Sequence, residues 1–156
     1  MNAEEIVAKI SSEIKDKIQE AALSAPRRIQ VKVAREQLNA VLAYLKNQLG
    51  FTHLGTISGA DLGDHFEVVY HMSNASATVN VRILTPRSDP MIPSVCAVIP
   101  VAILYERELQ DMFGLVVENI PDPRPLLLAD DWPAWQYPLR KDWHFERPAE
   151  VIPGGA

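Results

Sequence analysis

Apolar side chains recur with a helical period at the start of the chain and with other periods after it. Over residues 2–23 they repeat every four positions, which places them on one face of a helix: Ile6, Ile10, Ile14 and Ile18. We expect this amphipathic helix to end before Pro26. Alternation over residues 29–33 then predicts a half-buried strand. Apolar spacings of three and four over residues 38–49 predict a second helix, with Gly50 as its C-terminal cap.

Three further stretches alternate between apolar and polar residues, at 51–58, 66–70 and 79–83. Short polar connections separate them, so the pattern predicts an antiparallel meander of three strands. Together with the strand at 29–33, the meander indicates an α+β fold: an antiparallel or mixed sheet of about four strands, with helices packed on one face. The apolar run IPSVCAVIP, residues 92–100, is predicted to form a buried strand or loop.

A third helix is predicted for residues 101–113, ended by Gly114, and the character of the chain changes after it. Residues 121–156 hold seven of the twelve prolines and all three tryptophans, without a helical or strand period. This proline density favours an extended course, and the aromatic content argues against simple disorder, so we expect the tail to lie on another protein. The predicted parts are an N-terminal helix (1–26), an α+β body (27–118) and an extended C-terminal tail (119–156).

Composition narrows the classes of function. The chain has 156 residues, 47% of them hydrophobic, and its net charge of -5 argues against nucleic acid as a partner. The single cysteine, Cys96, excludes an internal disulfide and a cysteine-based zinc or iron–sulfur site, and fits a reducing, cytosolic compartment. The longest uncharged apolar run, residues 95–105, is shorter than the roughly 20 residues of a membrane span. The first ten residues do not resemble a secretory signal. We therefore expect a partner to hold the protein at any membrane where it works.

The decamer YERELQDMFG, residues 105–114, concentrates three acids and an arginine behind this apolar run. On a helical wheel the apolar face consists of Val101, Leu104, Tyr105, Leu109 and Met112. The wheel places Glu108 inside that face and Glu106 on the opposite, solvent-facing side. Arg107 and Asp111 lie together at the border and are predicted to form an i,i+4 ion pair.

A carboxylate in an apolar stripe is costly unless it is paired, so Glu108 is expected to bind a cation from the tail. The candidates are Arg124, Arg140 and Lys141. Such a network would lock the helix to the tail, and Glu108→Gln would impair assembly. The alternative is a small acid–base hydrolase that uses Glu106, Glu108 or Asp111 with a histidine. Neither a nucleophile nor a set of metal ligands accompanies these acids, which favours the structural interpretation.

The remaining candidates for chemistry are weaker. No metal-binding spacing connects the four histidines, His53, His65, His71 and His144. Cys96 lies among apolar residues and is predicted to be a packed core thiol. The aromatic series Trp132, Trp135, Tyr137 and Trp143 lacks the basic neighbours of a nucleic-acid site, so we interpret it as a set of anchors for a protein interface.

Three blocks of the sequence, taken in order, are specific: YERELQDMFGL at 105–115, PDPRPLLL at 121–128 and YPLRKDW at 137–143. Together they resemble the thirty-kilodalton subunit family of respiratory complex I and its relatives in membrane-bound nickel–iron hydrogenases and formate hydrogenlyases. The signature E-R-E-x-x-D-x-F-G is matched by Glu106, Arg107, Glu108, Asp111, Phe113 and Gly114. The pattern P-D-x-R-x-x-L is matched by Pro121, Asp122, Arg124 and Leu127. The pattern P-L-R-K-D is matched by Pro138, Leu139, Arg140, Lys141 and Asp142, with Trp143 where phenylalanine is usual.

The resemblance implies a subunit without a redox centre, in a membrane-bound, ion-translocating electron-transfer complex. Such a subunit packs on the large catalytic subunit, with its tail across that partner. The nickel–iron centre or quinone site and the iron–sulfur clusters would then belong to partner subunits. The expected location is peripheral, on the cytoplasmic side of the cell membrane, held there by the complex. Asn119-Ile120 and Gln136-Tyr137 stand where complex I members usually have Gly-His, which favours the hydrogenase branch over an NADH- or other donor:quinone oxidoreductase.

Overall fold

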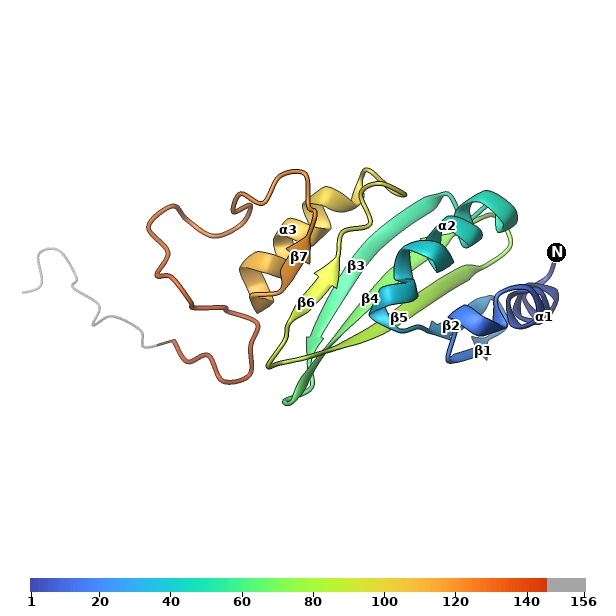
Figure 1. Ribbon diagram of the computed structural model, residues 1–156, viewed down its shortest axis with the longest axis horizontal. Helices are drawn as coiled ribbons and strands as arrows, with labels where there is room; N and C mark the ends of the chain where they lie inside the picture. The colour runs from blue at the N-terminus through green and yellow to red at the C-terminus, as the bar shows by residue number, and fades with distance from the viewer. Residues whose placement is uncertain (146–156) are drawn as a thin grey trace, which may run out of the picture.

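A five-stranded mixed sheet forms the centre of the computed structural model, which describes residues 1–145 (Figure 1). In spatial order its strands are β1 (Glu20–Ala25), β2 (Arg28–Lys32), β5 (Thr78–Pro86), β4 (His65–Ser73) and β3 (His53–Asp61). Strands β2 and β5 pair in parallel, and all other neighbours are antiparallel. The predicted α+β fold and the three-stranded meander are therefore confirmed, with β1 as an additional strand.

Alternation along the central strands buries one face of the sheet. In β4 the buried side chains are Phe66, Val68, Tyr70 and Met72. Their partners across β5 include Val79, Val81 and Ile83, which are fully buried in the same core as the inner faces of the helices. Residues with the opposite pleat, such as Arg82, stay exposed. Because successive side chains of a strand point to opposite faces, the helices are needed on one face only.

Three helices cover this face: α1 (Ala3–Glu13), α2 (Leu38–Leu49) and α3 (Ala102–Phe113). Helices α2 and α3 end where predicted, since Gly50 and Gly114 adopt left-handed backbone conformations with φ of 69° and 67°. A second, two-stranded parallel sheet pairs β6 (Met91–Pro93) with β7 (Val116–Glu118). It joins the apolar run before α3 to the segment after it. No helix within residues 1–145 is both long and apolar enough to span a bilayer.

The N-terminal helix is shorter than predicted. It begins at the Asn2 cap, whose side chain accepts the N–H of Glu5, and ends at Glu13. The second half of the expected helix instead forms a single 3-10 turn and then strand β1, which pairs with β2 through a hairpin. The isoleucine spacing extends past the helix to Ile14 and Ile18, but from Glu20 onward pairing with β2 outweighs local helical preference.

The tail crosses the end of the molecule opposite to α1 and β1 (Figure 1). Its described part, residues 119–145, contains neither helix nor strand. The remainder of the predicted tail, residues 146–156, lies outside the described residues. The extended course expected from the prolines stays a prediction.

Close packing of β3 against α3 gives a first test. Gly59→Ala is expected to lower the free energy of unfolding by about 1–3 kcal/mol, as overpacking of a filled core does. Its Cβ would lie 2.5 Å from Cε2 of Phe113 and 2.9 Å from Cδ2 of Leu109. Gly55→Ala is the matched control, because the nearest atom to its Cβ is the His71 carbonyl oxygen at 3.7 Å. Urea denaturation of both variants measures the difference, and equal losses would contradict this packing.

Candidate functional site

The carboxylate of Glu106 points from α3 into the core and is fully buried. Its Oε1 accepts the backbone N–H of Val95 at 2.6 Å. Its Oε2 accepts the Ser94 hydroxyl at 2.8 Å and the Cys96 thiol at 3.2 Å. Three donors from one turn thus satisfy a buried carboxylate, which ties α3 to the chain that follows β6. The prediction that Glu106 faces solvent is wrong.

The wheel failed because two of its apolar residues are exposed. Val101 and Leu104 have exposed fractions of 54% and 49%. The face of α3 that packs on the sheet consists instead of Ala102, Glu106, Leu109 and Phe113. Their spacing of four, three and four is helical, so the period was correct and the chosen face was not.

The predicted ion-pair network around Glu108 does not form among the described residues. Glu108 is only partly buried and has no hydrogen bond or ion pair there. Arg124 binds the carboxylate of Asp122, at 2.8 Å from Nε. Arg140 and Lys141 make their contacts elsewhere, as described below. Because Glu108 lies outside the core, its side chain does not need the compensating charge that we expected.

The first docking point of the tail, here called the proximal clasp, joins α3 to residues 122–128. Arg107 donates from Nε to the carbonyl of Arg124 at 2.7 Å and from Nη2 to that of Pro125 at 2.9 Å. Asp111, itself buried, accepts the backbone N–H groups of three consecutive leucines with one oxygen. The donors are Leu126 at 2.8 Å, Leu127 at 2.8 Å and Leu128 at 3.2 Å. Arg107 and Asp111 therefore bind the tail, and the predicted ion pair between them is absent from the described residues.

The distal clasp joins residues 139–142 to the C-terminal end of α3 and to the β3–β4 turn. Arg140 donates from Nε to the Phe113 carbonyl at 2.6 Å, where a cation also complements the helix dipole. The backbone N–H of Lys141 donates to Asp61 at 2.9 Å, and Asp142 pairs with Arg87 at 2.7 Å. Residues far apart in the sequence are thereby fixed to one another.

Gly114 is required by this contact as well as by its backbone angle. A Cβ at this position would lie 2.5 Å from the ring of Tyr137 and 2.7 Å from Nη2 of Arg140. The Arg140 guanidinium itself lies over the Tyr137 ring, 4.4 Å from its centroid. The tail therefore packs directly onto the helix cap, and only glycine leaves room for it.

Electrostatics strengthens the distal clasp. Burial of Asp61 opposes its ionisation, but the N–H groups of Lys141 and Gly63 and the Arg87 guanidinium outweigh it and lower the pKa of Asp61 to about 2. Ion pairing with Asp142 and Asp61 in turn raises the pKa of Arg87. Asp61 and Arg87 are thus both ionised at neutral pH. Asp61 and Arg87 were not among the predicted site residues, and the only local signal was the Asp-Leu-Gly turn that Asp61 closes onto Gly63.

Between the clasps, residues 129–138 form a loop that we call the arch. Trp132 and Trp143 pack together with ring centroids 6.0 Å apart, and both indole N–H groups donate to Gln136. Trp135 is 86% exposed. A hollow of about 260 Å³ lies between the arch and α3. The predicted aromatic anchors are therefore close together in space, and one of them projects outward.

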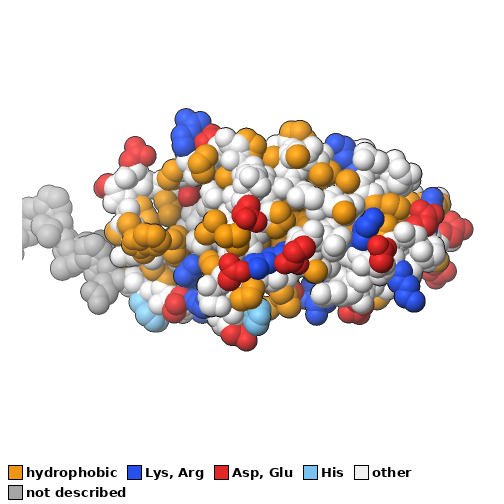
Figure 2. Space-filling view, viewed as in Figure 1, with side chains coloured by type: hydrophobic (Ala, Val, Ile, Leu, Met, Phe, Trp, Pro, Cys, Tyr) orange, Lys and Arg blue, Asp and Glu red, His pale blue; other side chains and the backbone are white. Residues whose placement is uncertain are grey.

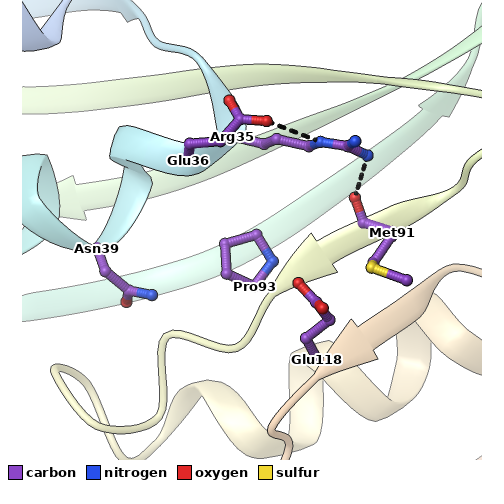
Figure 3. Close-up of a pocket in the computed structure, with 6 residues that line it drawn as sticks. All are labelled: Arg35, Glu36, Asn39, Met91, Pro93 and Glu118. Carbon is purple, nitrogen blue, oxygen red and sulfur yellow. Dashed lines mark hydrogen bonds and ion pairs between the residues drawn. The ribbon is translucent and has the colours of Figure 1, made fainter.

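A second hollow, of about 190 Å³, lies between the start of α2 and the β6–β7 pair (Figure 3). Arg35 crosses it and donates to the Met91 carbonyl at 3.0 Å and to the carboxylate of Glu36 at 3.1 Å. Asp89 binds the same guanidinium at 2.5 Å. The hydrogen bonds of the Arg35 guanidinium are thus made within its own chain. We therefore interpret Arg35 as a structural residue that connects the two sheets.

Groups suited to catalysis are not assembled in the described part of the chain. Residues 1–145 contain no cluster of three or more histidine, cysteine, aspartate or glutamate side chains that would hold a metal. Cys96 is buried, as predicted, and burial raises the pKa of its thiol to about 11 despite the Ser94 hydrogen bond. His71 bonds Ser58 at 3.0 Å and Asn80 at 2.9 Å on the uncovered face of the sheet.

Comparison with known proteins assigns the chain to a family. The family model for the 30-kDa subunit of respiratory-chain NADH dehydrogenase matches residues 31–149, which include the whole of both clasps. The chain belongs to this family. All three sequence blocks lie inside the matched range, so the resemblance drawn from them is confirmed.

Relatives come from several kinds of oxidoreductase complex. The chain is 35% identical over 147 residues to a subunit of the F(420)H(2) dehydrogenase of Methanosarcina mazei, covering 92% of each chain. It is 32% identical over 145 residues to hydrogenase-4 component G of Escherichia coli, covering 89% of this chain but 26% of that protein. In a solved structure of the membrane-bound sulfane sulfur reductase, an archaeal respiratory complex, one chain superposes with a TM-score of 0.81 at 26% identity. That match covers 90% of this chain and 85% of the other.

The proximal clasp predicts a local release of the tail. Asp111→Asn is expected to raise amide hydrogen exchange at residues 126–128 about tenfold or more, because a neutral amide accepts three N–H groups more weakly than a carboxylate. Glu108→Gln is the matched control on the same helix, since Glu108 has no hydrogen bond within residues 1–145. Exchange followed by mass spectrometry on the full chain measures both, and equal protection in the two variants would refute the clasp.

The distal clasp predicts a pH dependence. The pKa of Asp61 is lowered from 3.8 to about 2, so its carboxylate stabilises the fold fully above 3.8 and loses this effect as the pH falls through about 2. Asp61→Asn is therefore expected to lower the free energy of unfolding at pH 7 by up to about 2 kcal/mol.

Urea midpoints of wild type and variant should converge between about pH 4 and pH 2. Asp64→Asn, an exposed carboxylate on the same turn, serves as the control and should have a much smaller effect. A difference between wild type and Asp61→Asn that persisted at pH 2 would show that the carboxylate's charge is not its source.

Proposed function

We propose that this chain is a non-catalytic peripheral-arm subunit of a membrane-bound, ion-translocating electron-transfer complex of the complex I and energy-converting hydrogenase superfamily. Its role is to pack on the large catalytic subunit and stabilise it through α3 and the tail. Family membership supports this proposal, as do the relatives whose names mark them as components of oxidoreductase complexes. The observation that carries it is the apolar surface left uncovered by the chain's own fold.

That surface follows α3 and the tail. Val101 and Leu104 project from the helix on the side that neither the sheet nor the tail covers. Four apolar side chains of the described tail are more than half exposed: Leu127 at 55%, Trp135 at 86%, Leu139 at 53% and Phe145 at 64%. Figure 2 shows hydrophobic side chains gathered at this end of the molecule. Clustered exposed apolar groups beside a rigid scaffold are typical of protein interfaces.

The partners follow from the same proposal. The nickel–iron centre or quinone site and the iron–sulfur clusters belong to partner subunits, and the complex holds this chain on the cytoplasmic side of the membrane. The relatives include both a dehydrogenase subunit and a hydrogenase component, so hydrogenase and donor:quinone oxidoreductase complexes stay equal candidates.

Two of the three acids of the hydrolase alternative, Glu106 and Asp111, are already engaged within the chain. Glu106 is fully buried, and both of its oxygens accept hydrogen bonds from Ser94, Val95 and Cys96. Asp111 is occupied by the leucine N–H groups of the tail. A general acid or base must reach the reacting group, and neither carboxylate is free to do so.

Affinity purification of the tagged full chain from native membranes tests the proposal. We expect co-purification with a large subunit that is homologous to nickel–iron or quinone-site proteins, identified by mass spectrometry. Leu104→Asp is expected to abolish it without unfolding the chain, since a carboxylate would be buried against the partner.

The control is Leu23→Asp, a 40% exposed leucine on β1, at the end of the molecule remote from the tail (Figure 1). It should co-purify like wild type. Wild-type chain that purifies without redox subunits, or that turns over a substrate in isolation, would refute the proposed function.

A further inference from the structure

The hollow between the arch and α3 has a distinctive lining. Three aromatic residues, Trp132, Trp135 and Tyr137, line it together with two acidic residues, Asp111 and Asp130. Among the described residues that line it, none is a lysine or an arginine. Every formal charge on the lining residues is therefore negative, and of the three aromatic residues Tyr137 already has the Arg140 guanidinium over its ring.

Volume and charge together select one kind of occupant. A hollow of about 260 Å³ has room for one long side chain. A cation over an aromatic face is attracted by the ring quadrupole, most strongly for tryptophan. The planar guanidinium of arginine can stack flat on a ring while its edge forms a bidentate contact with a carboxylate, and the lysine ammonium lacks this planar geometry. The lining thus suits an arginine better than an apolar or acidic side chain.

Trp135 is held in position for such a contact. Its backbone adopts φ of 64°, a left-handed conformation that bulky residues rarely take. On either side of it, Trp132 and Trp143 are fixed by their hydrogen bonds to Gln136. Within residues 1–145 the Trp135 indole N–H has no hydrogen-bond partner, although its neighbours' N–H groups do. The arch therefore presents one exposed indole beside a hollow whose other rings are already fixed.

We propose that this hollow is a socket for an arginine side chain of the subunit on which the tail packs. The guanidinium stacks on Trp135 and pairs with Asp130, while Asp111 is already engaged by the leucine N–H groups. This inference rests on the proposed function and adds to it the residue type that the partner supplies. The competing occupant is Arg147 of the same chain, which lies outside the described residues.

Site-specific photo-cross-linking identifies the occupant directly. The full chain, with p-benzoylphenylalanine in place of Trp135, is incorporated into the native membrane complex, irradiated and digested for mass spectrometry. We expect the cross-linked peptide to come from the large subunit, with an arginine within about two residues of the attachment point. Attachment to residues 146–156 of the same chain, or to a neutral or acidic partner segment, would overturn the proposal.

Matched variants measure the interaction. Asp130→Asn is expected to speed dissociation of the subunit from the purified complex about two- to fivefold at moderate salt, the range of an exposed ion pair. Asp131→Asn should leave the rate unchanged, because Asp131 is an equally exposed neighbour that does not line the hollow. Trp135→Leu keeps an apolar side chain but lacks the ring quadrupole, and is expected to speed dissociation about three- to thirtyfold.

Different results would contradict the proposed function and the arginine socket. If the wild-type chain does not co-purify with redox subunits, the proposed function is wrong. If it does co-purify, but Asp130→Asn and Asp131→Asn dissociate at the same rate, the socket alone is wrong. The same holds if Trp135→Leu dissociates like wild type.

Discussion

A single carboxylate oxygen of Asp111, accepting three consecutive backbone N–H groups, determines how the second half of this protein is organised. The segment that it binds lies in a proline-rich tail that has no helix or strand of its own up to residue 145. Proline lacks an N–H group and blocks regular pairing, so the polar backbone needs partners outside the segment. Charged side chains of α3 provide them, and the course of the tail follows from where those side chains lie.

Helix α3 consequently has two buried sides. On the inner side, Glu106 bonds the turn after β6, and Leu109 and Phe113 pack on the sheet. On the outer side, Arg107 and Asp111 bind the tail, and the helix end is capped by Arg140. The stripe between these sides carries Val101 and Leu104 and is left open. A helix that joins core and tail in this way fixes the position of every exposed group near it.

Periodicity was sufficient for the elements whose packing is internal. Helices α2 and α3, their glycine caps and the meander all follow from local spacing. Strand β1 could not be found in this way, because its sequence EAALSA has no clear apolar alternation and its pairing with β2 decides the outcome. The helical wheel misassigned Glu106 and Glu108 for a different reason: it equated apolar with buried, whereas Val101 and Leu104 are apolar and exposed. Exposed apolar residues are common on protein surfaces, so the three-dimensional structure is needed to separate them from core residues. Asp61 lies 80 residues from Lys141, and a contact at that range has no local signature.

Most charged side chains of the three sequence blocks make their contacts within the chain. Arg107, Asp111, Arg140 and Asp142 are engaged within the chain, where they hold the tail against the body. What remains for a partner is mostly apolar or aromatic, with Trp135 as its most exposed member, beside the carboxylates of Glu108 and Asp130. A tail already fixed in one shape loses less conformational entropy on association than a free one. Under the proposed function, the internal charges strengthen binding without touching the partner, which gives a motif as polar as YERELQDMFG a role in a protein interface.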